Sequence, residues 1–474
     1  MKKGEYAVRT NLKIGIIVLI SVISIGWFLD AAPASGISDP QVVCRVEIDR
    51  KVLPVNGSQR AIVKVTLDAP PPPQTRERPA VNLAIVLDRS GSMSGEKLNK
   101  AKDAAIEALR RLSLQDIFYL VVYDHKVRTI VPAQSAGNVE WIEGRISKNR
   151  SGGNTALFGG VSQGAAEVRK NIRSEYVHRV ILLSDGLANV GPSTPDDLGR
   201  LGTALIKENI SVTTVGVGTD YNEDLMTQLA QNSDGNSYFV ESSYDLPRIF
   251  ASELGDVLSV VAKRVQLQIE CPEGVRPLGI IGRQGRIRGR SVELYLNQLY
   301  GSQEKYALVE VEIAGGSSGE QKDIAFAKVT YENPFTRKNE SSTGQVTARF
   351  SKDREEVKQS TNIGVYREYQ LNLDAMAKDK AISLADEGRK NEAVYELKES
   401  ARRLRQAGAD YDDARLLEKA DDAEEQAAVL EKEGMSKKQR KIMRTESFQM
   451  KTQQQMEYPI HGFCKGGWLS LIHI

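Results

Sequence analysis

Strand and helix patterns alternate along the chain from Val81 to about Val260, and this alternation constrains the fold more than any other feature. The segment opens with a near-continuous apolar run, Val81–Leu87, which is typical of a strand buried on both faces of a parallel sheet. Apolar residues at three- and four-residue spacing then predict a helix: Leu98, Ala101, Ala105, Ala108 and Leu112. Further strands are predicted at 117–123, 127–131, 177–184, 211–218 and 237–240, with helices near 140–147, 156–170, 195–208, 223–231 and 244–260. Residues 80–260 are therefore expected to form a doubly wound α/β domain.

Strand patterns without helices lie on both sides of this region. Residues 41–69 alternate apolar and polar side chains, and residues 70–79 form a Pro-rich, extended linker. Residues 262–350 carry strand patterns separated by Gly-rich turns, which predicts an antiparallel β-sandwich. The early strands are expected to complete this sandwich, with the α/β domain inserted into it or flanked by it.

Two cysteines fall on apolar strand faces of this sandwich region. Cys44 shares its face with Val46 and Ile48, and Cys271 follows the strand pattern that contains Leu267 and Ile269. In an oxidising compartment a Cys44–Cys271 disulfide can form, and two buried free thiols are the alternative. The sequence leaves both alternatives open.

The last part of the chain is predicted to be helical. Residues 364–434 carry apolar residues at helical spacing, and Gly388, Gly408 and Gly434 mark the expected helix ends, which predicts a helical hairpin or bundle. Residues 435–467 are interpreted as a basic and polar tail. The final residues, Leu469–Ile474, match the translation of a transposon end used in DNA library preparation, so residues 468–474 are interpreted as a sequencing or assembly scar.

The N-terminus has the pattern of an export signal. Four basic residues precede the apolar run Ile14–Leu29, and Ala32-Pro33-Ala34 offers the spacing of small residues that signal peptidase accepts. A helix over this run would be about 24 Å long, shorter than the ~30 Å hydrocarbon core of a bilayer. Residues 1–34 are therefore expected to be a cleaved signal peptide, with an uncleaved N-terminal anchor as the alternative. Either way the protein is expected to be exported, to the cell envelope, the periplasm or the medium.

Composition excludes several classes of protein. Lys and Arg number 64 against 62 Asp and Glu, so no global positive field attracts nucleic acid. Three cysteines exclude a disulfide-dense scaffold and a multi-cysteine metal site. Two local basic patches remain, at Arg283–Arg290 and at Lys437–Arg444, and neither contains interleaved aromatic residues. The second patch is expected to contact an anionic membrane surface or an acidic partner.

Polar residues with oxygen donors follow three separate segments of the α/β region. Asp88, Ser90 and Ser92 form an Asp-x-Ser-x-Ser motif after the first parallel strand, Thr155 follows a Gly-Gly-Asn turn, and Asp185 ends the 177–184 strand. The carboxyl ends of parallel strands meet at one edge of a sheet, so these groups are expected to converge there. The alternative is that the Asp and Ser residues only cap the helices that follow, as Ser94 or Thr155 would do.

Two carboxylates and three hydroxyls are hard oxygen ligands. They favour Mg²⁺, with Mn²⁺ or Ca²⁺ as alternatives, over zinc or copper. Two carboxylates leave a divalent cation roughly neutralised and still able to accept one more anionic oxygen. A partner protein's Asp or Glu carboxylate is the expected ligand.

This arrangement resembles the metal-ion-dependent adhesion site of von Willebrand factor A domains, including integrin inserted domains. The resemblance covers about residues 79–260 and includes the Val-Gly-Val-Gly segment 215–218 with Asp220 and Asn222. It implies that Ser90 and Ser92 bind the ion directly, and that Thr155, Asp88 and Asp185 bind it directly or through water. The whole layout resembles exported bacterial proteins related to inter-alpha-trypsin-inhibitor heavy chains, some of which are called calcium-activated chloride channel-like. One N-terminal apolar segment cannot line a channel, so a pore is not expected.

An enzyme is the alternative reading of the same residues, with the ion as a Lewis acid. A phosphoryl-transfer site built on Asp88 normally has a second acid two residues on, where this chain has Ser90. His125 and His178 lie at strand ends and are interpreted as polar edge residues rather than general bases. No catalytic residues are therefore assigned, and a metal-dependent binding function is expected.

Overall fold

The computed structural model describes residues 41–55, 57–74 and 76–454. The predicted export signal at residues 1–34 and the predicted scar at residues 468–474 lie outside these residues. Within the described part of the chain, none of the helices is both long enough and apolar enough to cross a membrane.

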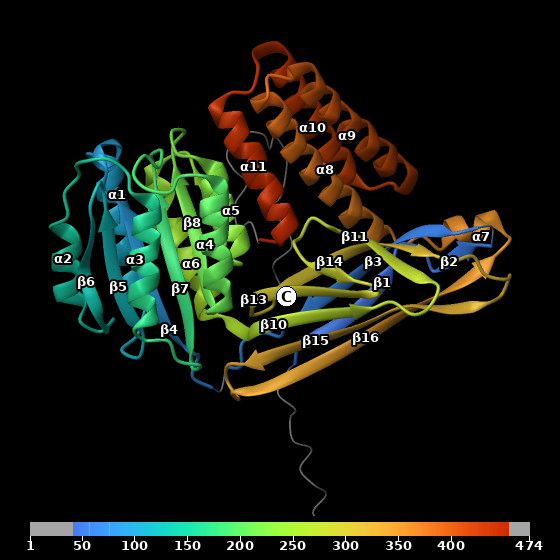
Figure 1. The fold of residues 1–474 in the computed structure, drawn as a ribbon, viewed down its shortest axis with the longest axis horizontal. Coiled ribbons are helices and arrows are strands. Elements are labelled where there is room, and N and C mark those ends of the chain that lie inside the picture. The colour runs from blue at the N-terminus through green and yellow to red at the C-terminus, as the bar shows by residue number, and fades with distance from the viewer. Residues whose placement is uncertain (1–40, 56, 75, 455–474) are drawn as a thin grey trace, which may run out of the picture. The chain divides into compact units, whose positions relative to one another are not determined.

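A six-stranded sheet forms the centre of the α/β domain (Figure 1). Its order is β6-β5-β4-β7-β8-β9, from the strands β4 (Ala80–Asp88), β5 (Ile117–Tyr123), β6 (Val127–Ser135), β7 (Tyr176–Ser184), β8 (Ile210–Val217) and β9 (Ser237–Val240). Strand β6 pairs antiparallel with β5, and the other pairs are parallel. The turn between β5 and β6 is too short for the crossover that a parallel pair needs, so this edge strand reverses direction.

Helices cover both faces of this sheet. One face packs against α1 (Glu96–Arg110), α2 (Val139–Ser147) and α6 (Leu246–Leu258). The other face packs against α3 (Leu157–Arg169), α4 (Pro195–Lys207) and α5 (Glu223–Asn232) (Figure 1). Short 3₁₀ turns, η1 (Gly91–Met93) and η2 (Ser243–Asp245), precede α1 and α6. The doubly wound α/β fold predicted from the alternation is confirmed.

Two further sheets pack face to face as a β-sandwich. The first has the order β1-β3-β14-β11, from β1 (Val43–Ile48), β3 (Gln59–Asp68), β14 (Glu304–Ile313) and β11 (Val275–Ile281). The second has the order β12-β13-β10-β15-β16-β2, from β12 (Arg286–Arg288), β13 (Ser291–Tyr300), β10 (Val260–Glu270), β15 (Gln321–Asn333), β16 (Lys338–Ser351) and β2 (Val52–Pro54). Strand β3 pairs with β14 along its whole length, so the early strands complete the sandwich around an inserted α/β domain. The sandwich is not wholly antiparallel, because β2 pairs parallel with the end of β16.

Cys44 and Cys271 are both buried in the sandwich core as free thiols. Cys44 lies on β1 and Cys271 follows β10, so the two residues belong to opposite sheets. The structure holds both residues as free thiols, which is one of the two alternatives that the sequence leaves open.

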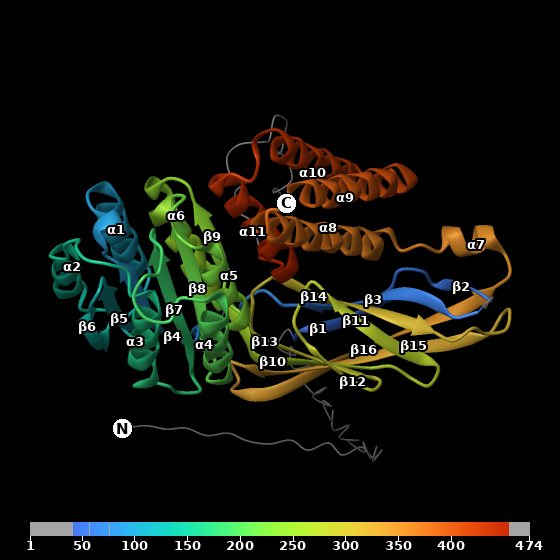
Figure 2. The same ribbon diagram turned by 45° about the horizontal axis from the view of Figure 1, so that its top comes forward.

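The C-terminal helices form an antiparallel group (Figure 2). They are α8 (Ile363–Asp386), α9 (Lys390–Tyr411), α10 (Ala414–Glu433) and α11 (Lys437–Thr452), preceded by the short α7 (Arg354–Gln359). Gly388 and Gly434 end helices with φ of +77° and +80°, as expected. Gly408 does not end a helix, because α9 continues to Tyr411. A Cβ at Gly408 would lie 2.7 Å from Leu417 Cδ2, so glycine there permits close packing of α10.

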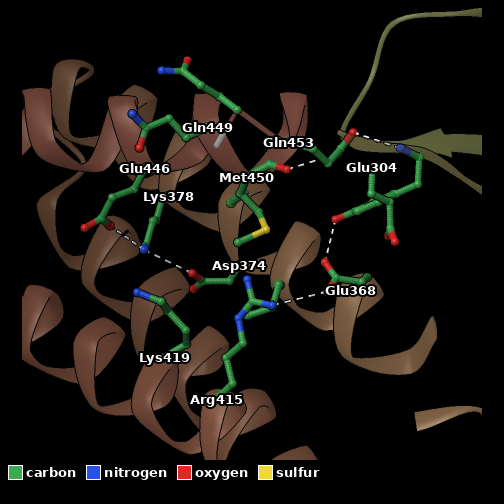
Figure 3. A pocket seen from close by; sticks show the side chains of 14 residues that line it. Glu304, Glu368, Asp374, Lys378, Arg415, Lys419, Glu446, Gln449, Met450 and Gln453 are labelled. Atoms are coloured by element: carbon green, nitrogen blue, oxygen red, sulfur yellow. Dashed lines mark hydrogen bonds and ion pairs between the residues drawn. The ribbon is translucent and has the colours of Figure 1, made fainter. Parts of the chain in front are cut away.

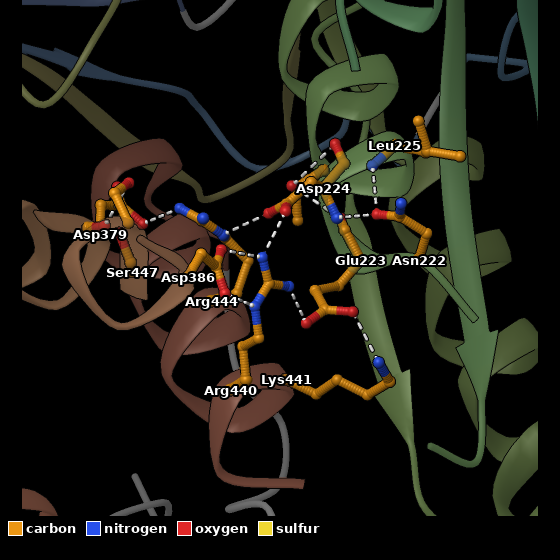
Figure 4. A network of polar contacts seen from close by, with 12 residues as sticks. Asn222, Glu223, Asp224, Leu225, Asp379, Asp386, Arg440, Lys441, Arg444 and Ser447 are labelled. Atoms are coloured by element: carbon orange, nitrogen blue, oxygen red, sulfur yellow. Dashed lines mark hydrogen bonds and ion pairs between the residues drawn. The ribbon is translucent and has the colours of Figure 1, made fainter. Parts of the chain in front are cut away.

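The segment predicted to be a basic and polar tail, residues 435–467, forms helix α11 in the part that the structure describes (Figure 4). Arg440 bonds Asp224 of α5 (2.6 Å) and Asp386 of α8 (2.7 Å), and Arg444 bonds Asp379 of α8 (2.5 Å). These cations join the α/β domain to the helical region. Arg440 and Arg444 are thus largely buried and paired inside the protein, whereas Lys437 and Lys438 at the start of α11 are 73 % and 48 % exposed.

Arg179 of β7 connects the α/β domain to the sandwich. Its guanidinium is fully buried and donates to Gln298 Oε1 (2.8 Å) and the Tyr300 hydroxyl (2.6 Å), both on β13. Glu253 of α6 lies 3.5 Å away and supplies the opposite charge. The sequence pattern did not predict this joint, because it depends on strands more than a hundred residues apart.

Candidate metal site

The predicted site residues lie at the point where the order of the six-stranded sheet reverses. Asp88 is the last residue of β4 and Asp185 follows the last residue of β7, and these two strands are neighbours at the centre of the sheet. The chain winds outward from β4 in one direction and from β7 in the other, so the connections leave a crevice between the two strand ends. Ligands of doubly wound proteins bind at this position.

Asp88 is completely buried and held in place by hydroxyl and amide donors. Its Oδ1 accepts a hydrogen bond from the Ser90 N–H (2.8 Å), and its Oδ2 accepts one from the Ser184 hydroxyl (2.7 Å). Burial raises the pKa of Asp88 to about 6, and the carboxylate of Asp185 adds to this effect. A nearby positive charge would therefore stabilise the ionised form.

The hydroxyls and the second carboxylate meet across the same crevice. Ser90 Oγ lies 3.1 Å from Ser92 Oγ, and the Ser92 hydroxyl donates to Asp185 Oδ1 at 2.6 Å. A Cβ placed on Gly186 would lie 3.2 Å from Thr155 Oγ1, 3.3 Å from Ser92 Oγ and 3.8 Å from Ser90 Oγ. The three hydroxyl oxygens therefore face one small space that the absence of a side chain at residue 186 keeps open.

Backbone hydrogen bonds fix the loops that carry these residues. The Gly91 N–H donates to the Gly153 carbonyl (3.0 Å), and the Gly152 N–H donates to the Arg89 carbonyl (2.8 Å), which joins the Asp88 loop to the Thr155 loop. Asn189 joins the third loop, because its Oδ1 accepts from the Thr155 N–H (2.8 Å). Asn189 was not predicted from the sequence, since nothing local distinguishes it from an ordinary loop residue.

The helix-capping alternative does not hold. Helix α1 has Gly95 at its N-cap position and α3 has Ala156, and neither helix receives a side-chain cap. Thr155 is 4 % exposed and its hydroxyl faces the crevice, while Ser94 lies before Gly95. The hydroxyls of Ser90, Ser92 and Thr155 do not cap α1 or α3 and can therefore bind a ligand in the crevice.

Lys97 is a functional candidate that sequence reasoning missed. Its Nζ lies 2.6 Å from Asp185 Oδ2, opposite the oxygen that Ser92 bonds. The sequence could have indicated Lys97, because this residue lies in the first turn of the helix that follows the Asp88 loop. Helical side chains point back toward the N-terminus of their helix, and here the Lys97 side chain therefore points to the strand ends and the buried carboxylate of Asp185.

The donor set fits a hard divalent cation. Across the described residues, no group of three or more His, Cys, Asp or Glu side chains is placed to hold a metal. The crevice instead combines the carboxylates of Asp88 and Asp185 with three hydroxyls, a set suited to Mg²⁺, Mn²⁺ or Ca²⁺ and unsuited to zinc. All five residues predicted from the sequence are brought together around it.

A cavity of about 370 Å³ lies between α8, α10, α11 and strand β14 (Figure 3). Lys378 on its wall is ion-paired with Asp374 (3.2 Å) and Glu446 (2.7 Å), and Arg415 lies 3.4 Å from Glu368. These wall charges already have partners within the protein. The cavity therefore offers a less definite site than the crevice at Asp88.

The fold and the crevice define a class: a doubly wound α/β domain with hard oxygen donors at its switch point. Residues 82–252 match the family model of the von Willebrand factor type A domain, and this part of the chain is such a domain. Domains of this family typically bind a divalent metal ion and often mediate protein interactions.

Curated relatives share the domain at low identity. The uncharacterised protein sll0103 of Synechocystis sp. is 26% identical over 54% of this chain and 62% of its own length. The uncharacterised protein YfbK of Escherichia coli is 28% identical over 45% of this chain and 37% of its own. Inter-alpha-trypsin inhibitor heavy chain H3 of Homo sapiens is 27% identical over 32% of this chain and 18% of its own. The chain thus spans less than two thirds of the length of each of these relatives.

Solved structures resemble more of the chain. A von Willebrand factor type A protein from Catenulispora acidiphila has a TM-score of 0.64 at 18% identity and covers 80% of this chain and 90% of its own. The ArnB paralog VWA2 from Sulfolobus acidocaldarius has a TM-score of 0.60 at 17% identity and covers 87% and 98%. At these identities the likeness shows a shared fold that extends beyond the α/β domain.

Proposed function

We propose that this protein binds a divalent cation, Mg²⁺ in the first place, through Asp88, Ser90, Ser92, Thr155 and Asp185, and uses it to bind an acidic residue of a partner protein. The observation that carries the proposal is the convergence of three hydroxyl oxygens on the space beside Gly186, with the Asp185 carboxylate bonded to one of them and the buried Asp88 at the end of the neighbouring strand. A protein-binding role also agrees with the usual role of the domain family.

The residues of the proposed cation site have different roles. Asp88 and Asp185 supply negative charge from positions without solvent exposure, and the Ser184 and Ser92 hydroxyls orient their carboxylates. Ser90, Ser92 and Thr155 add neutral oxygens. A bound divalent ion would supply the positive charge that attracts a partner's carboxylate. Ser92 is exposed, so the crevice opens to solvent on the side where a partner would approach.

We further propose that the protein is exported and acts in the cell envelope, the periplasm or the medium. The support is the signal pattern of residues 1–34, which ends in the Ala32-Pro33-Ala34 spacing. An N-terminal anchor would also give contact with a membrane.

Calorimetric titration with Mg²⁺, Mn²⁺ and Ca²⁺ tests the cation site. Asp88→Ala should weaken binding by more than the roughly 10- to 100-fold that loss of an outer-shell partner costs. Ser94→Ala is the matched control, because Ser94 lies in the same loop and outside the converging set. Absence of binding to the wild type, or equal binding by Asp88→Ala, would contradict the proposal.

Capture of proteins from the native cell envelope, with and without EDTA, tests the partner. Partners retained by the wild type should be lost with EDTA and with Asp88→Ala. A set of captured proteins that EDTA does not change would refute the metal bridge. Turnover of phosphoesters that requires Asp88 would instead favour the enzyme alternative.

A further inference from the structure

The ion pair between Lys97 and Asp185 joins two residues of very different burial. The Asp185 side chain has no exposed surface, whereas 37 % of the Lys97 side chain is exposed. The carboxylate is fixed by the Ser92 hydroxyl and the end of β7, while the lysine stem extends from α1 toward solvent. The ammonium can therefore leave into water, and the carboxylate cannot.

The Lys97 ammonium compensates the buried negative charge of the Asp185 carboxylate. Burying a carboxylate without a counter-charge is strongly unfavourable. Asp185 Oδ1 accepts from Ser92 at 2.6 Å and Oδ2 from Lys97 at 2.6 Å, so each carboxylate oxygen has a partner within the protein. Lys97 is the one cation paired with Asp185 among the described residues.

We propose that Lys97 is an internal counter-cation that holds Asp185 in the metal-free protein and competes with the divalent cation for it. Lys97 thereby sets the affinity of the site. This inference rests on the proposed function, because it concerns the regulation of the same cation site.

The loop that follows β8 lies close to Lys97 and carries a second carboxylate, Asp220. A Cβ added at Gly218 would lie 4.0 Å from Lys97 Nζ, so the ammonium lies near the loop that follows β8. Asp220 in this loop is ion-paired with Lys437 at 3.0 Å, and Lys97 adds a smaller contribution to the lowered pKa of Asp220. An ammonium displaced from Asp185 therefore has an exposed carboxylate within reach.

Mg²⁺ titration of four proteins tests the competition: wild type, Lys97→Met, Lys97→Arg and Lys100→Met. Methionine keeps the length of the lysine stem and removes the competing charge. A hydrogen bond to a charged group is worth about 1.5–3 kcal/mol, so Lys97→Met should bind Mg²⁺ roughly ten- to a hundredfold more tightly. Lys97→Arg keeps a competing cation and should bind no more tightly than the wild type.

Lys100→Met is the matched control for the general loss of positive charge. Lys100 lies on the same helix, and its Nζ contacts Asp103 at 3.5 Å rather than Asp185. This variant should stay within about twofold of the wild type, because Lys100 pairs with the 56 % exposed Asp103 and lies about one helical turn farther along α1 from the strand ends than Lys97 does. Equal affinity of Lys97→Met and the wild type, or equal tightening by Lys97→Met and Lys100→Met, would overturn the inference and leave the proposed function standing.

A measurement on the wild-type protein tests the same inference and does not require that any variant folds. The Lys97 ammonium should give a slowly exchanging NMR signal while it is ion-paired with Asp185, and Mg²⁺ should remove this signal. A signal unchanged at saturating Mg²⁺ would also overturn the inference. If neither the wild type nor Lys97→Met binds a cation, the proposed function fails and the inference with it. Binding by Lys97→Met alone would support both.

Discussion

The hydroxyl of Ser92 donates a 2.6 Å hydrogen bond to the carboxylate of Asp185, 93 residues further along the chain. Ser92 lies in the loop after β4 and Asp185 directly follows β7. The parallel pairing of these two strands brings both residues to one crevice.

Gly186→Ala should weaken cation binding about tenfold or more without unfolding the protein. The added methyl would lie 3.2–3.3 Å from Thr155 Oγ1 and Ser92 Oγ, so these hydroxyls would shift by tenths of an ångström and the space between them would fill. Calorimetric Mg²⁺ titration measures the loss. Gly255→Ala is the control, because a Cβ there meets no atom within 4 Å. Unchanged affinity of Gly186→Ala would show that the space is not the cation site.

Lys441→Met should lower the free energy of unfolding by about 3 kcal/mol, since it breaks a buried ion pair. Lys441 Nζ bonds Glu223 Oε2 (2.6 Å) and the Tyr221 carbonyl (2.8 Å), and both charged side chains are at most 5 % exposed. Urea denaturation followed by circular dichroism measures the change. Lys437→Met should cost less than about 1 kcal/mol, because Lys437 and Asp220 are both mostly exposed. An equal loss of unfolding free energy in the two variants would mean that the buried Lys441–Glu223 ion pair does not stabilise the packing of α11 on the α/β domain.

His178 should make the protein less stable as the pH falls from 6.5 toward 4. Its Nδ1 accepts from the Asn82 side-chain amide (3.0 Å) and its Nε2–H donates to the Arg173 carbonyl (3.1 Å), which fixes a neutral ring. Burial, with smaller effects of Lys263 and Arg264, lowers the pKa of His178 to about 4. The unfolded chain binds a proton below about pH 6.5 and the folded protein does not. The stabilisation is therefore complete above pH 6.5, and about 3 kcal/mol of it is lost by pH 4.

Urea denaturation at pH 7 and pH 4.5 measures this loss. His178→Gln should show a smaller decrease between the two pH values than the wild type. His125→Gln should behave as the wild type, because the His125 side chain is about half exposed. A His178→Gln variant with the full wild-type decrease would contradict the assignment.

Cys44 and Cys271 should resist alkylation in the folded protein at pH 8 and react once the protein is denatured, without any reductant. Burial raises the pKa of each thiol to about 11, so the reactive thiolate is scarce and inaccessible. Peptide mass spectrometry after iodoacetamide treatment with and without urea measures the modification. Alkylation that requires a reductant in urea would reveal a disulfide instead.

The α/β domain was predictable from sequence because its signals are local. An apolar run such as 81–87, followed by alternating helix and strand patterns, is typical of a parallel sheet covered on both faces. Asp88, Ser90, Ser92 and Asp185 follow the strand ends that such a sheet brings together. The inserted arrangement was predictable as well, because residues 41–69 have strand periodicity but contain too few strands to bury an apolar face without the strands at 262–350. The three-residue strands β2 and β12 were not predicted, because so few residues carry no periodicity and are held in place by their neighbours. Strand β11 was not predicted either, because Pro277 and Gly279 interrupt its apolar pattern.

The sequence by itself determined the class of the central domain, its two-layered helical cover and the five oxygen-bearing residues of its site. Tertiary structure alone decided which charges meet. Lys97 pairs with Asp185, Arg440 and Lys441 with α5, and Arg179 with residues of β13, each across distant parts of the chain. Periodicity reports which face of an element is apolar, and it carries no information on which cation will stand opposite which carboxylate. That choice depends on how separately formed layers pack, and it made part of the predicted basic and polar tail a helix, α11, that joins the α/β domain to the other C-terminal helices.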